Sequence, residues 1–157
     1  MGHFYTMKMA KLIRRFGPDD ADALKLIKDK VDIIFVSADH RGFPISEKRV
    51  NDMGFQLENV KAKDRLDWMA SKWDLKNVIY MGDSFVDIAI FNEITKAGGT
   101  AIMPNDGFYY AKEYATYVTH HNGGSRAVAE AVFWILKEIL SFTKDEIDEM
   151  IFKCGGR

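Results

Sequence analysis

Residues 78–87 read Val78-Ile79-Tyr80-Met81-Gly82-Asp83-Ser84-Phe85-Val86-Asp87, and they carry the clearest chemical signal in the sequence. The first four residues are apolar and have the length of a buried strand. Gly82 permits a turn, and carboxylates follow at positions 83 and 87. Open α/β sheets bind ligands outside the carboxyl ends of their strands. Two carboxylates at such an edge suit Mg²⁺, which prefers hard oxygen ligands.

An alternative interpretation gives both carboxylates purely structural roles. Asp83 would then cap the helix that follows, and Asp87 would be a solvated first-turn carboxylate that complements the helix dipole. The spacing of the two residues does not by itself distinguish these interpretations.

Apolar runs of strand length alternate with helical patterns along the rest of the chain. We predict strands at residues 31–37, 55–60, 78–81, 100–103 and 117–119, and helices that start at Pro18, Pro44 and Ser84 or cover residues 62–73, 108–114, 128–140 and 144–152. Such alternation produces βαβ units, a parallel sheet and helices on both of its faces. The sequence therefore predicts one α/β domain over residues 1–157 with a Rossmann-like parallel sheet, closed by a last helix and tail at residues 143–157. Thr143 and Glu146 are predicted to form a capping box at the start of this last helix.

Composition excludes several classes of protein. The formal net charge is −1 and no long run of Lys or Arg occurs, which argues against nucleic acid as the main partner. Cys154 is the only cysteine, so a disulfide framework within one chain is excluded. No apolar stretch is long enough to cross a bilayer, and Met1 is not followed by the charged segment and apolar core of a signal peptide, so we expect none. We expect a cytoplasmic protein without a membrane partner.

The polar residues at the predicted strand ends resemble motifs of the haloacid dehalogenase superfamily. Ser37 resembles the second motif, the basic residues around Lys63 and Arg65 the third, and Asp83 with Asp87 the fourth. More narrowly, the sequence resembles the small, cap-less phosphatases of 3-deoxy-octulosonate 8-phosphate and related sugar acids. The stretches that carry this narrower resemblance are residues 16–24, 37–42 and 82–87, and residues 117–119 with Gly123 and Gly124.

This resemblance implies hydrolysis of a phosphomonoester through a phospho-aspartate, with Mg²⁺ as the cofactor. It implies that Asp83 binds the metal and that Asp87 supports the metal or its waters. Ser37 and Arg41 are the implied substrate-binding residues. A cation of the third motif would balance charge on the transferred group; Arg65 is the first choice for this role and Lys63 the second.

The first motif of the family, an apolar strand that ends in Asp-x-Asp-Gly, has no counterpart in the sequence. Residues 2–6 resemble the outer strand of the β-hairpin flap that follows this motif, so we predict a flap hairpin within residues 1–16, with extended pieces at residues 2–6 and 9–16. Asp19 and Asp20 follow Gly17-Pro18 and are predicted to start a helix, not to replace the nucleophile. Without a nucleophile the phosphoryl-enzyme route is closed.

The missing strand belongs in the middle of the family's sheet, between the strands predicted at residues 31–37 and 78–81. The sheet could close up, the flap segment could move into the gap, or the sequence could be a truncated form of a longer protein. The third possibility is the one we favour from the sequence.

Three hypotheses for the function follow. The first is a Mg²⁺-dependent phosphatase of a sugar-acid phosphate, inactive in the form given. The second is a non-catalytic relative that binds a phosphorylated sugar or serves assembly, and the third is a phospho-receiver domain. The resemblance also implies a homotetramer in which the flap of one subunit closes the site of the next. A flap that folds back onto its own domain is the alternative.

Overall fold

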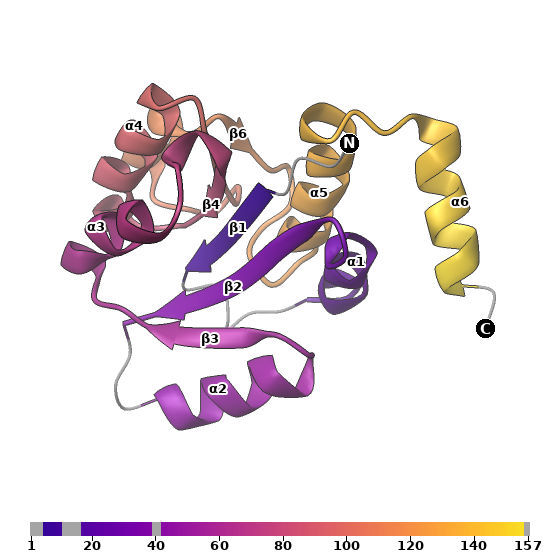
Figure 1. The fold of residues 1–157 in the computed structure, drawn as a ribbon, viewed down its shortest axis with the longest axis horizontal. Coiled ribbons are helices and arrows are strands. Elements are labelled where there is room, and N and C mark those ends of the chain that lie inside the picture. The colour runs from indigo at the N-terminus through magenta and orange to yellow at the C-terminus, as the bar shows by residue number, and fades with distance from the viewer. Residues whose placement is uncertain (1–4, 11–16, 39–41, 156–157) are drawn as a thin grey trace.

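A six-stranded parallel sheet forms the centre of the molecule (Figure 1). The structure is a computed structural model that describes residues 5–10, 17–38 and 42–155. The strand order is β3-β2-β1-β4-β5-β6, and every neighbouring pair is parallel. The strands are β1 (Tyr5–Ala10), β2 (Val31–Ser37), β3 (Gln56–Asn59), β4 (Val78–Met81), β5 (Thr100–Met103) and β6 (Tyr117–Val118). This is the doubly wound order in which the direction of winding reverses between β1 and β4. The predicted Rossmann-like fold is confirmed.

Helices cover both faces of the sheet, as predicted (Figure 1). The α-helices are α1 (Asp20–Ile27), α2 (Phe43–Asp52), α3 (Ala62–Lys72), α4 (Ile88–Lys96), α5 (Ala127–Trp134) and α6 (Lys144–Gly155), and the short helices are η2 (Leu75–Asn77), η3 (Phe85–Asp87), η4 (Tyr109–Tyr114) and η5 (Ile135–Ile139). None of the helices in the described parts of the chain has both the length and the apolar character that a membrane span requires.

The apolar run of β4 is buried on both faces because each face contacts a different layer of helices. Ile79 and Met81 belong to the core cluster that includes α1 and α5, whereas Val78 and Tyr80 belong to the cluster that includes α3 and α4. Side chains of a strand alternate between the two faces, so four consecutive buried residues require cover on both sides. This double burial fixes the position of the loop that begins at Gly82.

The boundaries of two helices differ from the predictions. The helix predicted over residues 128–140 begins at Ala127 and changes after Trp134 into the π-helix η5. The last helix continues to Gly155, beyond its predicted end at residue 152, so Cys154 lies in the helix and not in a loose tail. Its predicted capping box is confirmed, because Thr143 N–H donates to Glu146 and Glu146 N–H donates to the Thr143 hydroxyl.

The N-terminal segment differs most from the prediction. Residues 5–10 form one continuous strand, so the tight turn predicted between Thr6 and Met9 is wrong. This strand lies between β2 and β4 and is parallel to both, with Met7 beside Ile33 on one side and Ile79 on the other. Residues 5–10 therefore fill the central position of the sheet. Movement of the flap segment into this gap was the second of the three possibilities considered, and not the one that we favoured. The rest of the predicted hairpin, residues 1–4 and 11–16, lies outside the described residues.

A proline at position 7 tests this placement. Met7→Pro removes a backbone donor from the middle of the sheet, where a proline is not tolerated. We expect urea denaturation to show a loss of at least about 2 kcal/mol in the free energy of unfolding. Lys144→Pro, at the first position of α6, is the matched control and should change stability little. Equal midpoints for Met7→Pro and the wild type would contradict a central β1.

Candidate functional site at the carboxyl edge of the sheet

Ser37 and Asp83 lie at the carboxyl edge of the sheet, on opposite sides of β1, as the pairing of the strands shows. Ala10 at the end of β1 pairs with Val36, one residue before Ser37, and Met9 pairs with Met81, two residues before Asp83. Two strand spacings of about 4.8 Å place the backbones at these positions roughly 10 Å apart. The edge between β1 and β4 is also where the winding reverses, which is the usual ligand-binding position in such sheets.

The loop after β4 is organised around the Asp87 carboxylate. Asp87 Oδ2 accepts the backbone N–H groups of Asp83 (3.0 Å) and Ser84 (2.9 Å). The cap of η3 is Ser84, so the interpretation of Asp83 as the cap is wrong. Gly82 is required here because a Cβ atom at this position would lie 2.6 Å from the Asp87 carboxyl carbon. Asp87 therefore holds the loop that presents Asp83.

A buried chain of polar side chains runs from Arg65 through Tyr80 to Asp87. Arg65 Nη1 donates to the Tyr80 hydroxyl at 2.9 Å, and this hydroxyl donates to Asp87 Oδ1 at 2.7 Å. Arg65 Nη1 also lies 3.7 Å from Asp87 Oδ1, and both side chains are fully buried. Burial, and then the negative charge of Asp87, raises the pKa of Tyr80 well above its ordinary value. The phenol is therefore neutral and keeps its proton for Asp87.

The structure thus places Arg65, predicted from the third motif, in direct contact with Asp87, predicted from the fourth. Arg65 Nη2 donates to the Val60 carbonyl at 3.1 Å, and its Nε has no hydrogen-bond partner in the described part of the protein. Lys63, the second choice for the cation, is exposed in the same first turn of α3. Arg41 lies outside the described residues. The catalytic and ligand-binding roles of these residues remain predictions.

The donor set does not fit the two-carboxylate magnesium site that the sequence predicts. Both oxygens of Asp87 already accept hydrogen bonds, from three donors in all. Among the described residues, no group of three or more His, Cys, Asp or Glu side chains could hold a metal ion. Asp83, the other carboxylate of this pair, is half-buried directly after β4.

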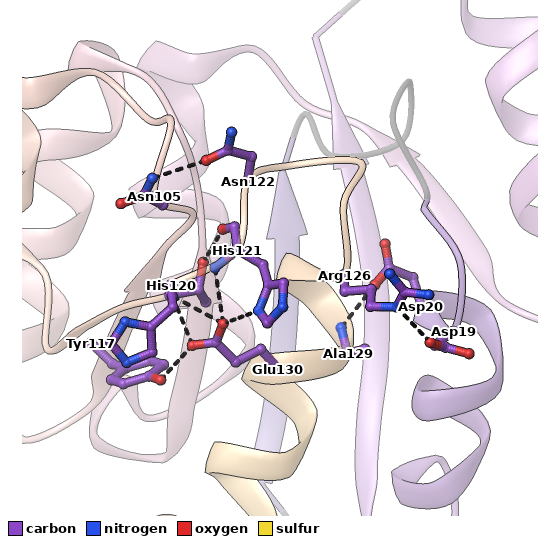
Figure 2. A network of polar contacts seen from close by, with 11 residues as sticks. Asp19, Asp20, Asn105, Tyr117, His120, His121, Asn122, Arg126, Ala129 and Glu130 are labelled. Carbon is purple, nitrogen blue, oxygen red and sulfur yellow. Dashed lines mark hydrogen bonds and ion pairs between the residues drawn. The ribbon is translucent and has the colours of Figure 1, made fainter.

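Glu130 on α5 organises a second loop, residues 119–125, which follows β6 (Figure 2). Its carboxylate accepts the Tyr117 hydroxyl at 2.5 Å, His121 Nδ1 at 2.6 Å, and the backbone N–H groups of His120 and His121. Burial alone raises the pKa of Glu130, but these hydrogen bonds outweigh burial and lower it to about 2. Burial, followed by the hydrogen bond to Glu130, raises the pKa of Tyr117 to about 12.

The start of α1 is fastened to this second loop and to α5 (Figure 2). Asp20 is fully buried and accepts the backbone N–H groups of Gly17 (2.8 Å) and Ala129 (2.9 Å). Burial raises the pKa of Asp20. Asp19 forms an exposed 2.8 Å ion pair with Arg126, a residue 107 positions away in the sequence. Both aspartates therefore have structural roles at a helix start, as predicted.

Sequence reasoning missed Glu130 and Tyr80 as organising residues. Each stands in an otherwise apolar run, Tyr80 in the strand 78–81 and Glu130 in the helical stretch that starts at Ala127. A lone polar group inside a run that is buried must have a hydrogen-bond partner. That rule could have identified both residues, but not the partners themselves, because these come from distant parts of the chain.

The strand order defines a doubly wound α/β protein, and β1 and β4 form the edge where sheets of this class usually bind their ligands. Comparison of the sequence with protein-family models found no match, and comparison with curated proteins found none either. Solved structures do match, at low sequence identity, and they share the fold of this chain.

Three of these structures illustrate the likeness. The 3-deoxy-D-manno-octulosonate 8-phosphate phosphatase from Moraxella catarrhalis, in complex with magnesium, phosphate and 3-deoxy-D-manno-octulosonate (KDO), has a TM-score of 0.77 and 18% identity over 96% of this chain and 93% of its own. The cobalt-bound deoxy-D-mannose-octulosonate 8-phosphate phosphatase from Haemophilus influenzae has a TM-score of 0.73 and 20% identity over 94% and 96%. A Legionella pneumophila protein described as a HAD-superfamily (subfamily III A) hydrolase has a TM-score of 0.76 and 15% identity over 96% and 90%.

Replacement of Arg65 tests whether it belongs to the buried network. Arg65→Met leaves Asp87 as a buried charge without its cation, so we expect a loss of about 3–5 kcal/mol in the free energy of unfolding. Lys63→Met, at an exposed position of the same helical turn, should change stability by less than about 0.5 kcal/mol. Chemical denaturation of both variants decides the matter. A stable Arg65→Met protein would contradict the structural role.

The low pKa of Glu130 predicts a pH-dependent contribution to stability. A folded-state pKa of about 2, below the ordinary 4.5, means that the contribution is present above pH 4.5 and is lost as the pH falls toward 2. Glu130→Gln should therefore lose about 2–3 kcal/mol at pH 7, and the gap to the wild type should narrow between about pH 4.5 and 2. Glu138→Gln, an exposed substitution in η5, is the control and should show no such gap. A gap that is constant over this pH range would refute the assignment.

Proposed function

We propose that this is a phosphatase-like protein that binds a phosphorylated sugar acid, such as 3-deoxy-octulosonate 8-phosphate, at the edge where β1, β2 and β4 end. The observation that carries the proposal is the placement of Ser37 and Asp83 on either side of β1, where the winding of the sheet reverses. The fold shared with two phosphatases of this substrate supports it.

In this proposal Ser37 binds the phosphate through its hydroxyl. Ser37 is the last residue of β2 and is 8% exposed. A buried hydroxyl that donates to a charged phosphate oxygen contributes about 1.5–3 kcal/mol. Arg41, four positions later in the sequence, is the proposed second contact with the ligand and would supply the positive charge that Arg65, occupied with Asp87, does not.

The central strand of the described sheet does not supply the carboxylate for hydrolysis through a phospho-aspartate. Residues 5–10, which occupy the central strand, contain no Asp or Glu, and the first acidic residue of the sequence is Asp19. Asp19 is paired with Arg126, and Asp20 with two backbone N–H groups. We therefore propose binding without turnover. A natural chain that carries an additional Asp-x-Asp strand is the catalytic alternative, and that strand would have to displace β1.

We propose that Mg²⁺ binds only weakly at this edge of the sheet. With Asp83 as its one protein carboxylate from the fourth motif, we expect a Kd on the order of 1 mM or weaker. Subunit assembly also stays a proposal. The tetramer inferred from the resemblance relied on a flap hairpin, and residues 5–10 of that flap are part of the sheet instead.

The test is a binding and turnover experiment on the same protein. We expect 3-deoxy-octulosonate 8-phosphate to bind in calorimetry, and Ser37→Ala to weaken this binding about tenfold. Ser71→Ala, which removes an exposed hydroxyl on α3, is the control and should bind as the wild type does.

Phosphate release from the same ligand, measured with and without Mg²⁺, should stay at the background rate. Mg²⁺-dependent turnover that disappears in Asp83→Asn would contradict the proposal and favour a phosphatase. Absence of any binding would remove the proposed ligand class.

A further inference from the structure

A row of aromatic side chains lies exposed beside the loop that carries Asp83. We call it the aromatic row; it consists of Phe85, Phe108, Tyr109, Tyr110 and Tyr114, and its successive ring centroids are 5.9, 5.0, 6.3 and 6.4 Å apart. The first four residues are exposed by 62%, 44%, 75% and 53%. The proposed function does not use these residues, and the polar contacts of the site do not require them.

One end of the aromatic row adjoins the candidate site. Phe85 begins η3 two residues after Asp83, and the backbone N–H of Phe108 donates to the Asp83 carbonyl at 2.9 Å. The other end leads away from it, because Tyr114 packs against the core cluster that includes α4. The pair Phe85 and Phe108 is therefore the part of the row that a ligand at Asp83 can reach.

The size of the row argues for a small ligand. A fully exposed aromatic side chain presents about 150–250 Å², so the four exposed members present roughly 500 Å² together. A stable protein interface buries about 800 Å² on each partner. The row is too small to hold a second copy of the chain by itself, but it is larger than one face of a sugar ring.

We propose that Phe85 and Phe108 form a stacking platform for the sugar ring of a ligand whose phosphate lies at the Ser37 and Asp83 edge. This inference rests on the proposed function and specifies how the organic part of the ligand is recognised. The apolar C–H face of a six-membered sugar ring lies against the exposed face of Phe85, which is uncharged and therefore does not repel the carboxylate of a sugar acid. Ring-to-ring contacts of Phe85 with Phe108 hold the platform in place.

The experiment compares two phosphate esters in calorimetry, 3-deoxy-octulosonate 8-phosphate, which carries a sugar ring, and glycerol 3-phosphate, which does not. Phe85→Ala should weaken binding of the first about tenfold, because it removes the apolar surface against which the sugar ring packs. It should leave binding of the second unchanged. Tyr110→Ala, which removes an exposed ring farther along the row, is the matched control and should affect neither ligand.

The outcomes separate this inference from the proposed function. Equal binding of the sugar phosphate by Phe85→Ala and the wild type, or an equal loss for both esters, overturns the stacking platform and leaves phosphate binding intact. Failure of both esters to bind the wild type overturns the platform and the proposed function together. Self-association of the wild type that Phe85→Ala abolishes in light scattering, without an effect on ligand affinity, would assign the row to a second copy of the chain and overturn the platform.

Discussion

A strand in the middle of a parallel sheet needs hydrogen-bond partners along both of its edges, and this requirement governs the whole molecule. Residues 5–10 meet it by pairing with β2 and β4. Without them, two buried strand edges would each lose their backbone partners, at about 1–3 kcal/mol for every orphaned group. The same pairing aligns the ends of β2 and β4, so Ser37 and Asp83 reach one edge of the sheet because β1 spaces them.

The buried charged side chains near this edge are already paired with other groups of the protein. Asp87 gives both of its oxygens to Tyr80 and to the backbone of the loop, and Arg65 balances its charge without reaching solvent. A carboxylate that already accepts three hydrogen bonds has little acceptor capacity left for Mg²⁺. Glu130 has the corresponding role at the second loop. The candidate site is therefore a rigid polar frame in which Asp83 and Ser37 are the groups proposed to meet a ligand.

Local sequence patterns were sufficient to predict much of the fold. The uninterrupted apolar run of β4 predicted a buried strand, and Thr143 with Glu146 predicted the cap of α6. The sequence was insufficient where long-range pairing decides the structure. Residues 2–16 have the alternation of a hairpin, yet residues 5–10 pair with strands 26 and 72 positions away, as Tyr5 with Val31 and Thr6 with Val78 show. The motif residues were identified individually, but the contact between Arg65 and Asp87 depends on how α3 packs beside β4, which no local pattern encodes.

The central claim is that residues 5–10 form the middle strand of the sheet, and amide hydrogen exchange measured by NMR tests it most directly. The backbone amides of Met7, Lys8 and Met9 should exchange only by global unfolding, with protection as strong as that of Ile79 and Tyr80 in β4. Exchange of these three amides at the rate of an unstructured peptide, while β4 stays protected, would contradict the claim. The centre of the sheet would then have to be filled by another segment.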